Sequence, residues 1–434
     1  MARIIDVEVR DIRFPTSLDL DGSDAMNPDP DYSVAYVTLR TDGPKALTGS
    51  GFTFTIGRGN ELCVLACKSM APMLIGLELD DLRADLSLVW NTLVGDSQFR
   101  WVGPEKGVIH LATAALVNAV WDLLAKAEGK PIWRFLSDLT AAEIVSIVDF
   151  RYISDALTPS EAMDLISEAR SKNVLRERDL LKDGLLAYTT SAGWLGYEDD
   201  KVRRLCREAV DDGWGHFKVK VGGDIVEDLR RCRMVREEIG WDRALMLDAN
   251  QKWGISESIE NMRQLAEVSP LWIEEPTSPD DILGHARILK AIAPVGVATG
   301  EMVHNRIMFK QMLQANALTY LQIDSCRLGG LNEVVAVLLL AAKFEVPVVP
   351  HAGGVGLCEY VQHIAAFDYL TIARDPSKIL VEYVNHLHEH FVDPVRIENA
   401  HYMLPTAPGY SASIRDESLE DFTFPTGRIW MGRS

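Results

Sequence analysis

Short apolar runs follow one another through the second half of the chain, and segments of helical periodicity separate them. Eight runs have the length of a strand: 185–189, 216–223, 244–250, 271–276, 295–301, 320–326, 346–354 and 379–384. Parallel strands that are buried on both faces are near-continuously apolar in this way. The intervening segments with helical spacing include 201–211, 228–239, 257–268 and 331–343. This alternation predicts an eight-stranded parallel α/β barrel over residues 185–385.

The last seven runs each end at or near a polar residue of a type that can do chemistry. In chain order these residues, 23 to 31 positions apart, are Lys220, Asp248, Glu274, Glu301, Asp324, His351 and Glu382. One βα unit takes roughly 30 residues in a barrel of ~250, and barrel active sites lie at the C-terminal ends of the strands. A single polar residue ends a strand in many α/β proteins. Seven in register favour one shared active site.

The first 150 residues have a different pattern. Alternating segments at 4–13, 33–40 and 48–56 predict an antiparallel meander, and helical segments are expected at 61–75, 81–94 and 106–128. Gly129, Lys130 and Pro131 end the last of these helices. Residues 1–150 are therefore predicted to form an α+β capping domain ahead of the barrel.

Three further segments complete the predicted organisation. The loop near 17–32 is rich in Asp, Gly, Pro and Ser, so we expect a mobile lid over the barrel mouth, with an ordinary surface loop as the alternative. Residues 151–184 are expected to be a charged helical insertion without an assigned role. Residues 386–434 are Pro- and Tyr-rich with little periodicity, and we expect them to return to the capping domain.

The composition excludes several classes of function. A chain of 434 residues with 47% hydrophobic content can bury a large core, and its net charge of −19 argues against nucleic acids and anionic membranes as partners. The six cysteines show neither zinc spacing nor a disulfide framework, and the start MARIIDVEVRD has no apolar core of a signal peptide. We therefore expect reduced thiols and a cytoplasmic location. The apolar stretch 108–125 contains His110, Asn118 and Asp122, which favours a buried core helix over a membrane span.

Asp248, Glu274 and Glu301 stand on three consecutive predicted strands. Three hard oxygen ligands converging on one point suit Mg²⁺, and the lack of His or Cys among them disfavours zinc. Three carboxylates would repel one another strongly without a cation. The sequence therefore predicts a magnesium site.

The residues around this triplet predict proton-transfer chemistry. Lys218 and Lys220 point to the same side of one strand, and a neighbouring cation and partial desolvation would lower a lysine's pKa enough for Lys220 to act as a general base. Asp324 and His351 end consecutive strands, so the carboxylate can orient the imidazole and raise its pKa for acid catalysis. Asn250 is expected to hydrogen-bond substrate. Glu382 could hydrogen-bond a substrate carboxylate oxygen only if it were protonated or if the substrate shared its proton.

Together these groups describe proton abstraction next to a carboxylate. The α-proton of a carboxylate is hardly acidic, and its removal needs a divalent cation and hydrogen-bond donors aimed at the enediolate. If the adjacent carbon carries a hydroxyl, an acid can protonate it and expel water.

In this order and spacing, the motif Lys218-Val219-Lys220, the triplet of acids and the Asp324/His351 pair resemble the enolase superfamily, and within it the mandelate-racemase-like acid-sugar dehydratases. The resemblance covers essentially the whole chain. It implies a modified (β/α)₇β TIM barrel with an N-terminal α+β cap, Mg²⁺ as cofactor and a homo-oligomeric assembly. The muconate-lactonising branch carries a lysine on the sixth strand, where this chain reads Ile323-Asp324-Ser325-Cys326.

The stretches 299–330 and 351–363 and the 154–184 insertion resemble the L-fuconate dehydratase family. That resemblance implies conversion of L-fuconate to 2-keto-3-deoxy-L-fuconate and water. Lys220 would take the C2 proton and His351 would assist loss of the 3-hydroxyl. The substrate would contact Lys218, Asn250 and Glu382, with Asp24 and Tyr32 of the lid at its distal hydroxyls.

Several alternatives share the same template. A dehydratase of another aldonate or aldarate would use every barrel residue named, and a racemase or epimerase would use Lys220 and His351 on opposite faces of one carbon. A barrel that no longer catalyses a reaction and serves as a binding protein is a further alternative. Such a protein would have lost at least one of the acid, the base and the metal ligands, whereas all are present.

Overall fold

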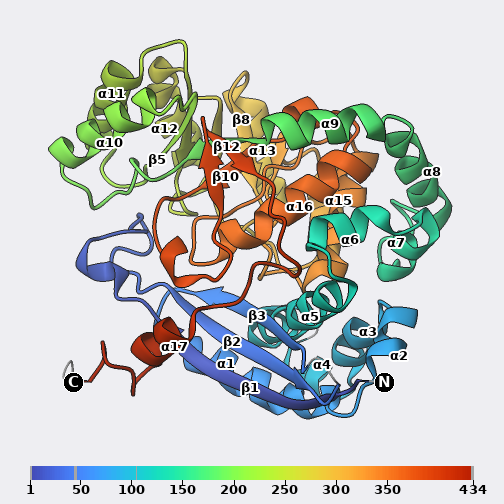
Figure 1. Cartoon of the computed structure of the whole chain (residues 1–434). Helices are drawn as coiled ribbons and strands as arrows, with labels where there is room; N and C mark the ends of the chain where they lie inside the picture. Colours follow the sequence, from blue (N-terminus) through green and yellow to red (C-terminus); the bar gives the residue numbers. More distant parts are fainter. Residues whose placement is uncertain (1, 44–45, 104, 432–434) are drawn as a thin grey trace.

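The computed structural model describes residues 2–43, 46–103 and 105–431. It consists of a cap built mainly from the first 150 residues and a barrel built from residues that follow (Figure 1). In Figure 1 the cap lies below, in blue and teal, and the barrel lies above it, in green to orange.

The cap contains a three-stranded antiparallel sheet in the order β1-β2-β3, formed by β1 (Ile4–Arg13), β2 (Ser33–Thr41) and β3 (Thr48–Thr55). Helices α1 (Asn60–Met70) and α5 (Gly107–Glu128) pack against this sheet. The remaining helices before the barrel are η1 (Thr16–Leu18), η2 (Ala71–Leu74), α2 (Leu79–Ala84), α3 (Leu88–Gly95), α4 (Phe99–Val102), α6 (Ile132–Asp138) and α7 (Ala141–Ile147). The predicted meander is confirmed, and its first strand has the predicted bounds.

The single helix predicted at 81–94 is wrong. The chain forms α2 and α3 with a break at 85–87, where Asp85 Oδ1 accepts hydrogen bonds from the backbone N and the hydroxyl of Ser87 at 2.9 and 2.7 Å. Such local side-chain hydrogen bonds offer the backbone an alternative to the helix.

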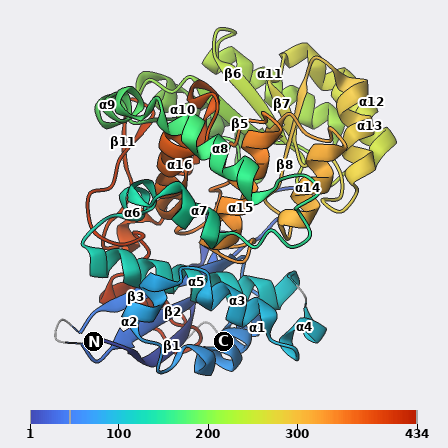
Figure 2. The same cartoon turned by 90° about the vertical axis from the view of Figure 1, so that its right-hand side faces the viewer.

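Helix α5 is long and apolar enough to cross a membrane, but 89% of its most apolar window is buried inside the protein. It lies between the cap sheet and helix α15 (Leu331–Lys343) of the barrel (Figure 2). The prediction of a buried core helix at 108–125 is confirmed.

The barrel strands pair in the order β10-β4-β5-β6-β7-β8-β9, all parallel. They are β4 (Leu185–Thr189), β5 (His216–Lys220), β6 (Ala244–Asp248), β7 (Trp272–Glu274), β8 (Gly296–Thr299), β9 (Tyr320–Leu321) and β10 (Val381–Tyr383). The helices between them are α10 (Asp199–Asp211), α11 (Ile225–Ile239), α12 (Ile255–Leu265), η3 (Ala266–Val268), α13 (Ile282–Ile292), α14 (Arg306–Gln314), α15, α16 (Leu357–Thr371) and η4 (Pro376–Lys378).

The strand predicted at 346–354 is only partly right. Its one strand pairing is a parallel bridge between Val348 and Leu321, although the backbone N atoms of Val349 and His351 also donate to β9 and the residues after it. Pro347 and Pro350 lack the N–H donors that a longer ladder needs.

Two segments outside the barrel repeat complete the molecule. Helices α8 (Pro159–Arg170) and α9 (Asn173–Asp183) pack on α16, so the charged insertion is helical as predicted. After β10 come η5 (His388–His390), β11 (Arg396–Glu398), β12 (His401–Met403) and α17 (Asp416–Phe422). Strand β12 pairs with β4, and α17 packs on β1 of the cap (Figure 1).

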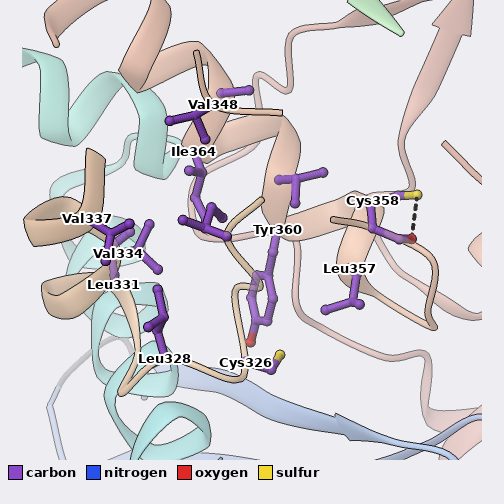
Figure 3. Close-up of a cluster of buried hydrophobic side chains, with 14 of the residues drawn as sticks. Cys326, Leu328, Leu331, Val334, Val337, Val348, Leu357, Cys358, Tyr360 and Ile364 are labelled. Carbon is purple, nitrogen blue, oxygen red and sulfur yellow. Dashed lines mark hydrogen bonds between the residues drawn. The ribbon is translucent and has the colours of Figure 1, made fainter. Parts of the chain in front are cut away.

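One hydrophobic core continues from the barrel into the cap. Figure 3 shows part of it, where side chains from α15 and α16 meet the loop that carries Leu328. Tyr360 of α16 stacks on Phe52 of β3 with ring centroids 4.3 Å apart, and its hydroxyl accepts a hydrogen bond from the Phe52 backbone N at 3.0 Å. The cap therefore packs against the barrel through a shared core and lies over the C-terminal ends of the barrel strands.

Candidate active site

A cavity of about 460 Å³ lies at the barrel mouth, between the barrel and the cap. Its lining comes from the lid, the end of β3, α1, α5 and the loops after several barrel strands. Seven of the polar or aromatic residues that line it are Asp24, Tyr32, Trp194, Lys220, Asn250, Glu301 and His351. Residues far apart in the sequence therefore meet around one space large enough for a small molecule.

The three predicted metal ligands converge beside this cavity. Asp248, Glu274 and Glu301 each offer a carboxylate oxygen, and these oxygens all lie within 4.8 Å of one another. The strand register explains the convergence, because Asp248 pairs with Lys220 on one side and with Glu274 on the other. Glu301 follows Gly300, which holds a φ of 145°.

The electrostatics of the triplet fit a divalent cation. Burial and the Asp248 carboxylate raise the pKa of Glu274 to about 8. Glu301 Oε2 is buried and accepts no hydrogen bond, although His351 Nε2 lies 3.3 Å from it. A hard cation that prefers oxygen would relieve the repulsion among the three carboxylates, so these residues fit Mg²⁺.

Lys218 lies deep in the barrel and is 1% exposed. Its Nζ is 2.6 Å from Glu274 Oε1, 2.7 Å from Glu382 Oε1 and 3.4 Å from Asp248 Oδ2. Although burial acts to lower its pKa, Glu274 and Glu382 raise it well above the ordinary value. Lys218 is therefore a cation held among carboxylates and does not line the cavity.

Lys220 lines the cavity, and its Nζ is 2.6 Å from Asp248 Oδ2. Burial and the Lys218 ammonium lower the pKa of Lys220, but Asp248, Glu301 and Asp24 raise it more, so that these groups by themselves shift it upward. Asp248 and Glu301 are two of the three predicted metal ligands, and a bound cation would offset their charge. The lowering of this pKa by a neighbouring cation therefore stays a prediction.

His351 and Asp324 form the expected pair. His351 Nδ1 is 2.9 Å from Asp324 Oδ2, while Oδ1 of Asp324 accepts from the backbone N atoms of Cys326 and Arg327, both at 2.7 Å. Burial acts to lower the pKa of His351, but Glu301 and Asp324 raise it to about 9. The other imidazole nitrogen, Nε2, lies 3.3 Å from Glu301 Oε2.

Glu382 is placed differently from the prediction. Its Oε1 accepts from Thr190 Oγ1 at 2.6 Å and pairs with Lys218, while Oε2 accepts from the Ala352 backbone N at 2.8 Å. Burial acts to raise its pKa, but Lys218 and His351 lower it well below the ordinary value. Fixed donors hold the Glu382 carboxylate in its ionised form, so it would not itself donate a proton to substrate. A contact in which the substrate shares its own proton with Glu382 stays a prediction.

Asn250 lines the cavity, and its Oδ1 is buried without a hydrogen-bond partner. Its backbone N donates to Asp248 Oδ1 at 2.9 Å, and its φ of 43° lies in the left-handed region. The turn after β6 therefore places Asn250 at the cavity, with its backbone bound to Asp248. Its hydrogen bond to substrate stays a prediction.

The lid lies against the barrel. Ser23 accepts two hydrogen bonds at 3.0 Å, from Leu195 N to its carbonyl oxygen and from Gly196 N to its hydroxyl. Tyr197 also donates a hydrogen bond to Asp21. Asp24 and Tyr32 both line the cavity, although Asp24 uses its Oδ1 to accept from the backbone N atoms of Met26 and Asn27. Their contact with distal hydroxyls stays a prediction.

Several cavity residues carried no signal in the sequence. Trp194 stands in the loop after β4, Phe54 at the end of β3, and Arg327 in the loop after β9. Loop positions have no period, so the repeat that located the strand ends does not reach them. Only Trp194 could have been expected near the barrel mouth, because it comes nine residues after the start of the first barrel strand and so lies in the loop that follows this strand.

Two protein-family models match this chain. One, described as enolase C-terminal domain-like, matches residues 201–418. The other, the N-terminal domain of mandelate racemase / muconate lactonizing enzyme, matches residues 26–137. Mitochondrial enolase superfamily member 1 of Homo sapiens is 53% identical over 430 residues, which are 99% of this chain and 97% of that protein. Its crystal structure matches with a TM-score of 0.97 over 99% of this chain and 98% of that one.

Two dehydratases are also similar. L-Galactonate dehydratase of Hypocrea jecorina is 52% identical over 421 residues, which are 96% of this chain and 93% of that protein. L-Talarate/galactarate dehydratase from Salmonella typhimurium LT2, crystallised with Mg and L-lyxarohydroxamate, is 23% identical with a TM-score of 0.75 over 97% of this chain and 93% of that one. The second of these likenesses shows a shared fold.

Proposed function

This chain belongs to the enolase superfamily, in its mandelate racemase and muconate lactonizing enzyme group, and from that membership and the geometry of the site we propose that it is a Mg²⁺-dependent acid-sugar dehydratase. The observation that carries the proposal is the meeting of three kinds of group at one cavity. These are a triplet of carboxylates, a lysine on the strand before them, and a carboxylate-oriented histidine. The 52% identity to an L-galactonate dehydratase over nearly the whole chain supports the same class of reaction.

Asp248, Glu274 and Glu301 would hold the cation, and the Mg named with the Salmonella structure supports its identity. When bound, a divalent cation supplies positive charge that stabilises the negative charge developing on the substrate carboxylate as the C2 proton leaves. Lys218, buried among Glu274, Glu382 and Asp248, adds a fixed positive charge behind these ligands.

Lys220 is the proposed base. Its Nζ stands at the cavity, held by Asp248, and in its neutral form would accept the C2 proton of the substrate. Breaking the C2–H bond would leave its electron pair in an enediolate, with a double bond between C1 and C2 and the negative charge on the carboxylate oxygens. The pair would move to form the C2–C3 double bond when the 3-oxygen leaves.

His351 is the proposed acid. Because Nδ1 is bonded to Asp324, Nε2 is the nitrogen left to donate a proton to the departing 3-hydroxyl. That oxygen leaves with the electron pair of the C3–O bond and the donated proton, as water. The resulting enol becomes the 2-keto-3-deoxy acid by transfer of a proton to C3, so the net change is loss of one water molecule.

The proposed substrate is L-fuconate, and L-galactonate is the second candidate. The two acids share their configuration from C2 to C5 and differ at C6, which is a methyl group in L-fuconate and a hydroxymethyl group in L-galactonate. The named relative favours L-galactonate. The apolar part of the cavity lining favours the methyl group; it includes Met26, Phe54, Ile56, Leu62, Val108 and Leu111.

The test is a panel of acid-sugar diastereomers assayed for 2-keto-3-deoxy product with Mg²⁺ and with excess EDTA. We expect metal-dependent turnover, with kcat/KM for L-fuconate above that for L-galactonate because of the apolar lining. The reverse ratio would assign L-galactonate as the substrate. Exchange of the C2 proton or epimerisation without loss of water would assign a racemase on the same template, and the absence of both with every acid would refute the proposal.

A further inference from the structure

Trp194 stands beside the proposed base, Lys220, but is neither a proposed metal ligand nor a proposed base or acid. Its side chain is 2% exposed and lines the cavity. Lys220 Nζ lies 5.4 Å from the centroid of the indole ring, within the range of a cation–π contact. The ammonium therefore has two neighbours that fix its direction, the Asp248 carboxylate at 2.6 Å and the face of this ring.

The backbone around Trp194 is fixed on the barrel side. The Lys220 backbone N donates to the Gly193 carbonyl at 2.9 Å, and Arg231 Nη2 donates to the Trp194 carbonyl at 2.9 Å. A Cβ on Gly193 would come within 2.2 Å of the Lys218 carbonyl oxygen, so only glycine lets the loop lie this close to β5. The indole is thus placed relative to the strand that carries Lys220.

The lid fixes the same loop from the other side. Ser23 holds Leu195 and Gly196, the two residues that follow Trp194, through its carbonyl oxygen and its hydroxyl. The position of the indole over Lys220 therefore depends on the lid lying in the place described here.

The indole N–H has no part in these contacts. Trp194 Nε1 is buried without a hydrogen-bond partner, and burying an unpaired donor costs free energy. Within the described residues, the Trp194 side chain therefore contacts Lys220 through its ring face and not through its N–H.

We propose that Trp194 is a positioning residue, whose ring holds the Lys220 amino group toward the substrate carbon when the lid is in place. Lys side chains have four rotatable bonds, and a flexible base loses rate steeply when it is displaced by about 1 Å. The inference rests on the proposed function, because it needs Lys220 to be the base.

The experiment compares Trp194→Phe and Trp194→Leu by the rate of C2 hydrogen–deuterium exchange and by kcat and KM. Trp194→Phe keeps an aromatic face and loses only the unused N–H, so we expect an exchange rate and a kcat within about threefold of wild type. Trp194→Leu removes the face, and we expect both to fall by about tenfold or more, with a smaller change in KM. Trp194→Met takes its place if the leucine variant does not fold.

Trp90→Leu is the matched control. Trp90 is also 2% exposed, its Nε1 is also unpartnered, and its ring lies 5.1 Å from the Arg306 guanidinium, away from the cavity lining. We expect a similar loss of thermal stability with unchanged exchange and kcat. Equal exchange rates in wild type and Trp194→Leu would overturn the inference and leave the proposed function standing, as would a Trp194→Phe variant as slow as the leucine variant. Absence of exchange by the wild type on every acid would refute the proposed function and this inference together.

Discussion

At the scale of single residues, the two lysines of β5 have different proposed roles because one is buried behind the cavity and the other faces it. Lys218 contacts three carboxylates and lies outside the cavity lining, whereas Lys220 has one carboxylate partner and faces the cavity. Replacing Lys218 would leave several buried anions without a partner, which is costly to folding. Replacing Lys220 leaves Asp248 with Lys218 at 3.4 Å as its remaining lysine partner and removes the ammonium that faces the cavity.

The separate roles of Lys220 and His351 give the first prediction. Lys220→Ala should reduce both C2 proton exchange and water loss by at least about 10²-fold, because the base is absent. His351→Asn should reduce water loss by a similar factor and retain C2 exchange. Parallel measurement of deuterium incorporation and keto-acid formation checks both, and equal loss of exchange in the two variants would contradict separate roles.

The ligand set gives the second prediction. Glu274→Gln should weaken Mg²⁺ binding by about tenfold or more in titration calorimetry, because it removes one of three charged oxygen ligands. Glu333→Gln is the control, since Glu333 is an equally buried carboxylate that pairs with Arg306 and His110 away from the cavity. Unchanged Mg²⁺ affinity in Glu274→Gln would remove Glu274 from the ligand set.

The barrel residues could be predicted from the sequence because a strand end recurs with each βα unit. Asp248, Glu274 and Glu301 come together for that reason. The carboxylate contacts that raise the pKa of Lys220, and the lysine contact that lowers the pKa of Glu382, could not be predicted, since they depend on which neighbour each side chain meets inside the barrel. Trp194 depends on a loop conformation, for which no pattern exists.

At the scale of elements, the strands are held together most tightly where the ligands emerge. Gly300 joins β8 to Glu301, and a Cβ at this position would lie 1.9 Å from the Gln322 carbonyl oxygen in the segment after β9. Its φ of 145° is also unfavourable for any residue with a side chain. Close packing of neighbouring backbones therefore determines where Glu301 points.

Gly300→Ala should accordingly lower the free energy of unfolding by about 3 kcal/mol or more and weaken Mg²⁺ binding through displacement of Glu301. Gly95→Ala, at the end of α3, is the matched control because nothing lies within 4 Å of its added Cβ. We expect that control to stay within about 1 kcal/mol of wild type. Urea denaturation with and without Mg²⁺ compares the two variants. Equal free energies of unfolding for Gly300→Ala and Gly95→Ala would contradict the prediction, because the backbone around Gly300 would then shift at little cost.

Element prediction from the sequence succeeded where the periodicity was strong. Strand β1 and helix α15 have the predicted bounds, whereas Asp85 divides a predicted helix and the prolines around Val348 reduce a predicted strand to a bridge. The short pair β11 and β12 was not predicted, because three-residue strands are too short to show alternation.

At the scale of the whole molecule, a buried charge network joins the cap to the barrel. Arg306 of α14 is 1% exposed and pairs with Glu105 at 2.8 Å, Glu333 at 3.0 Å and Asp149 at 3.1 Å. His110 of α5 lies 2.5 Å from Glu333 through its Nε2. Because these residues come from the cap, the segment before the insertion and the barrel, the network fixes the relative position of the two parts.

Acid should weaken this junction. Burial acts to raise the pKa of Glu333, but His110 and Arg306 lower it to about 2, below its ordinary 4.5. When folding lowers the pKa of a carboxyl group, the ionised group stabilises the folded protein at any pH above its unfolded-state pKa. That stabilisation is lost as the pH falls toward the folded-state pKa. The contribution of ionised Glu333 should therefore be about 3 kcal/mol at neutral pH and decline between about pH 5 and pH 2.

Glu333→Gln tests this contribution, because it removes the charge of Glu333 and keeps its size. His110 and Arg306 pair with Glu333, and Glu105 and Asp149 pair with Arg306. The stability difference between wild type and variant should be largest above pH 5 and should shrink as the pH falls. Urea denaturation from pH 7 to pH 3.5 measures it. A difference that does not depend on pH would contradict the assignment.

The return of the C-terminal segment to the cap has a consequence for biosynthesis. Asp122 of α5 accepts hydrogen bonds from Ser50 in β3 and Tyr410, both at 2.7 Å, and Tyr36 accepts one from Ile414 at 3.1 Å. On the ribosome, the cap strands emerge first, yet the residues that complete their packing emerge last. A nascent chain would hold an unfinished cap through synthesis of the entire barrel, with apolar surface exposed to chaperones. The cavity, which both Tyr32 and His351 line, would be complete only after nearly the whole chain had left the exit tunnel.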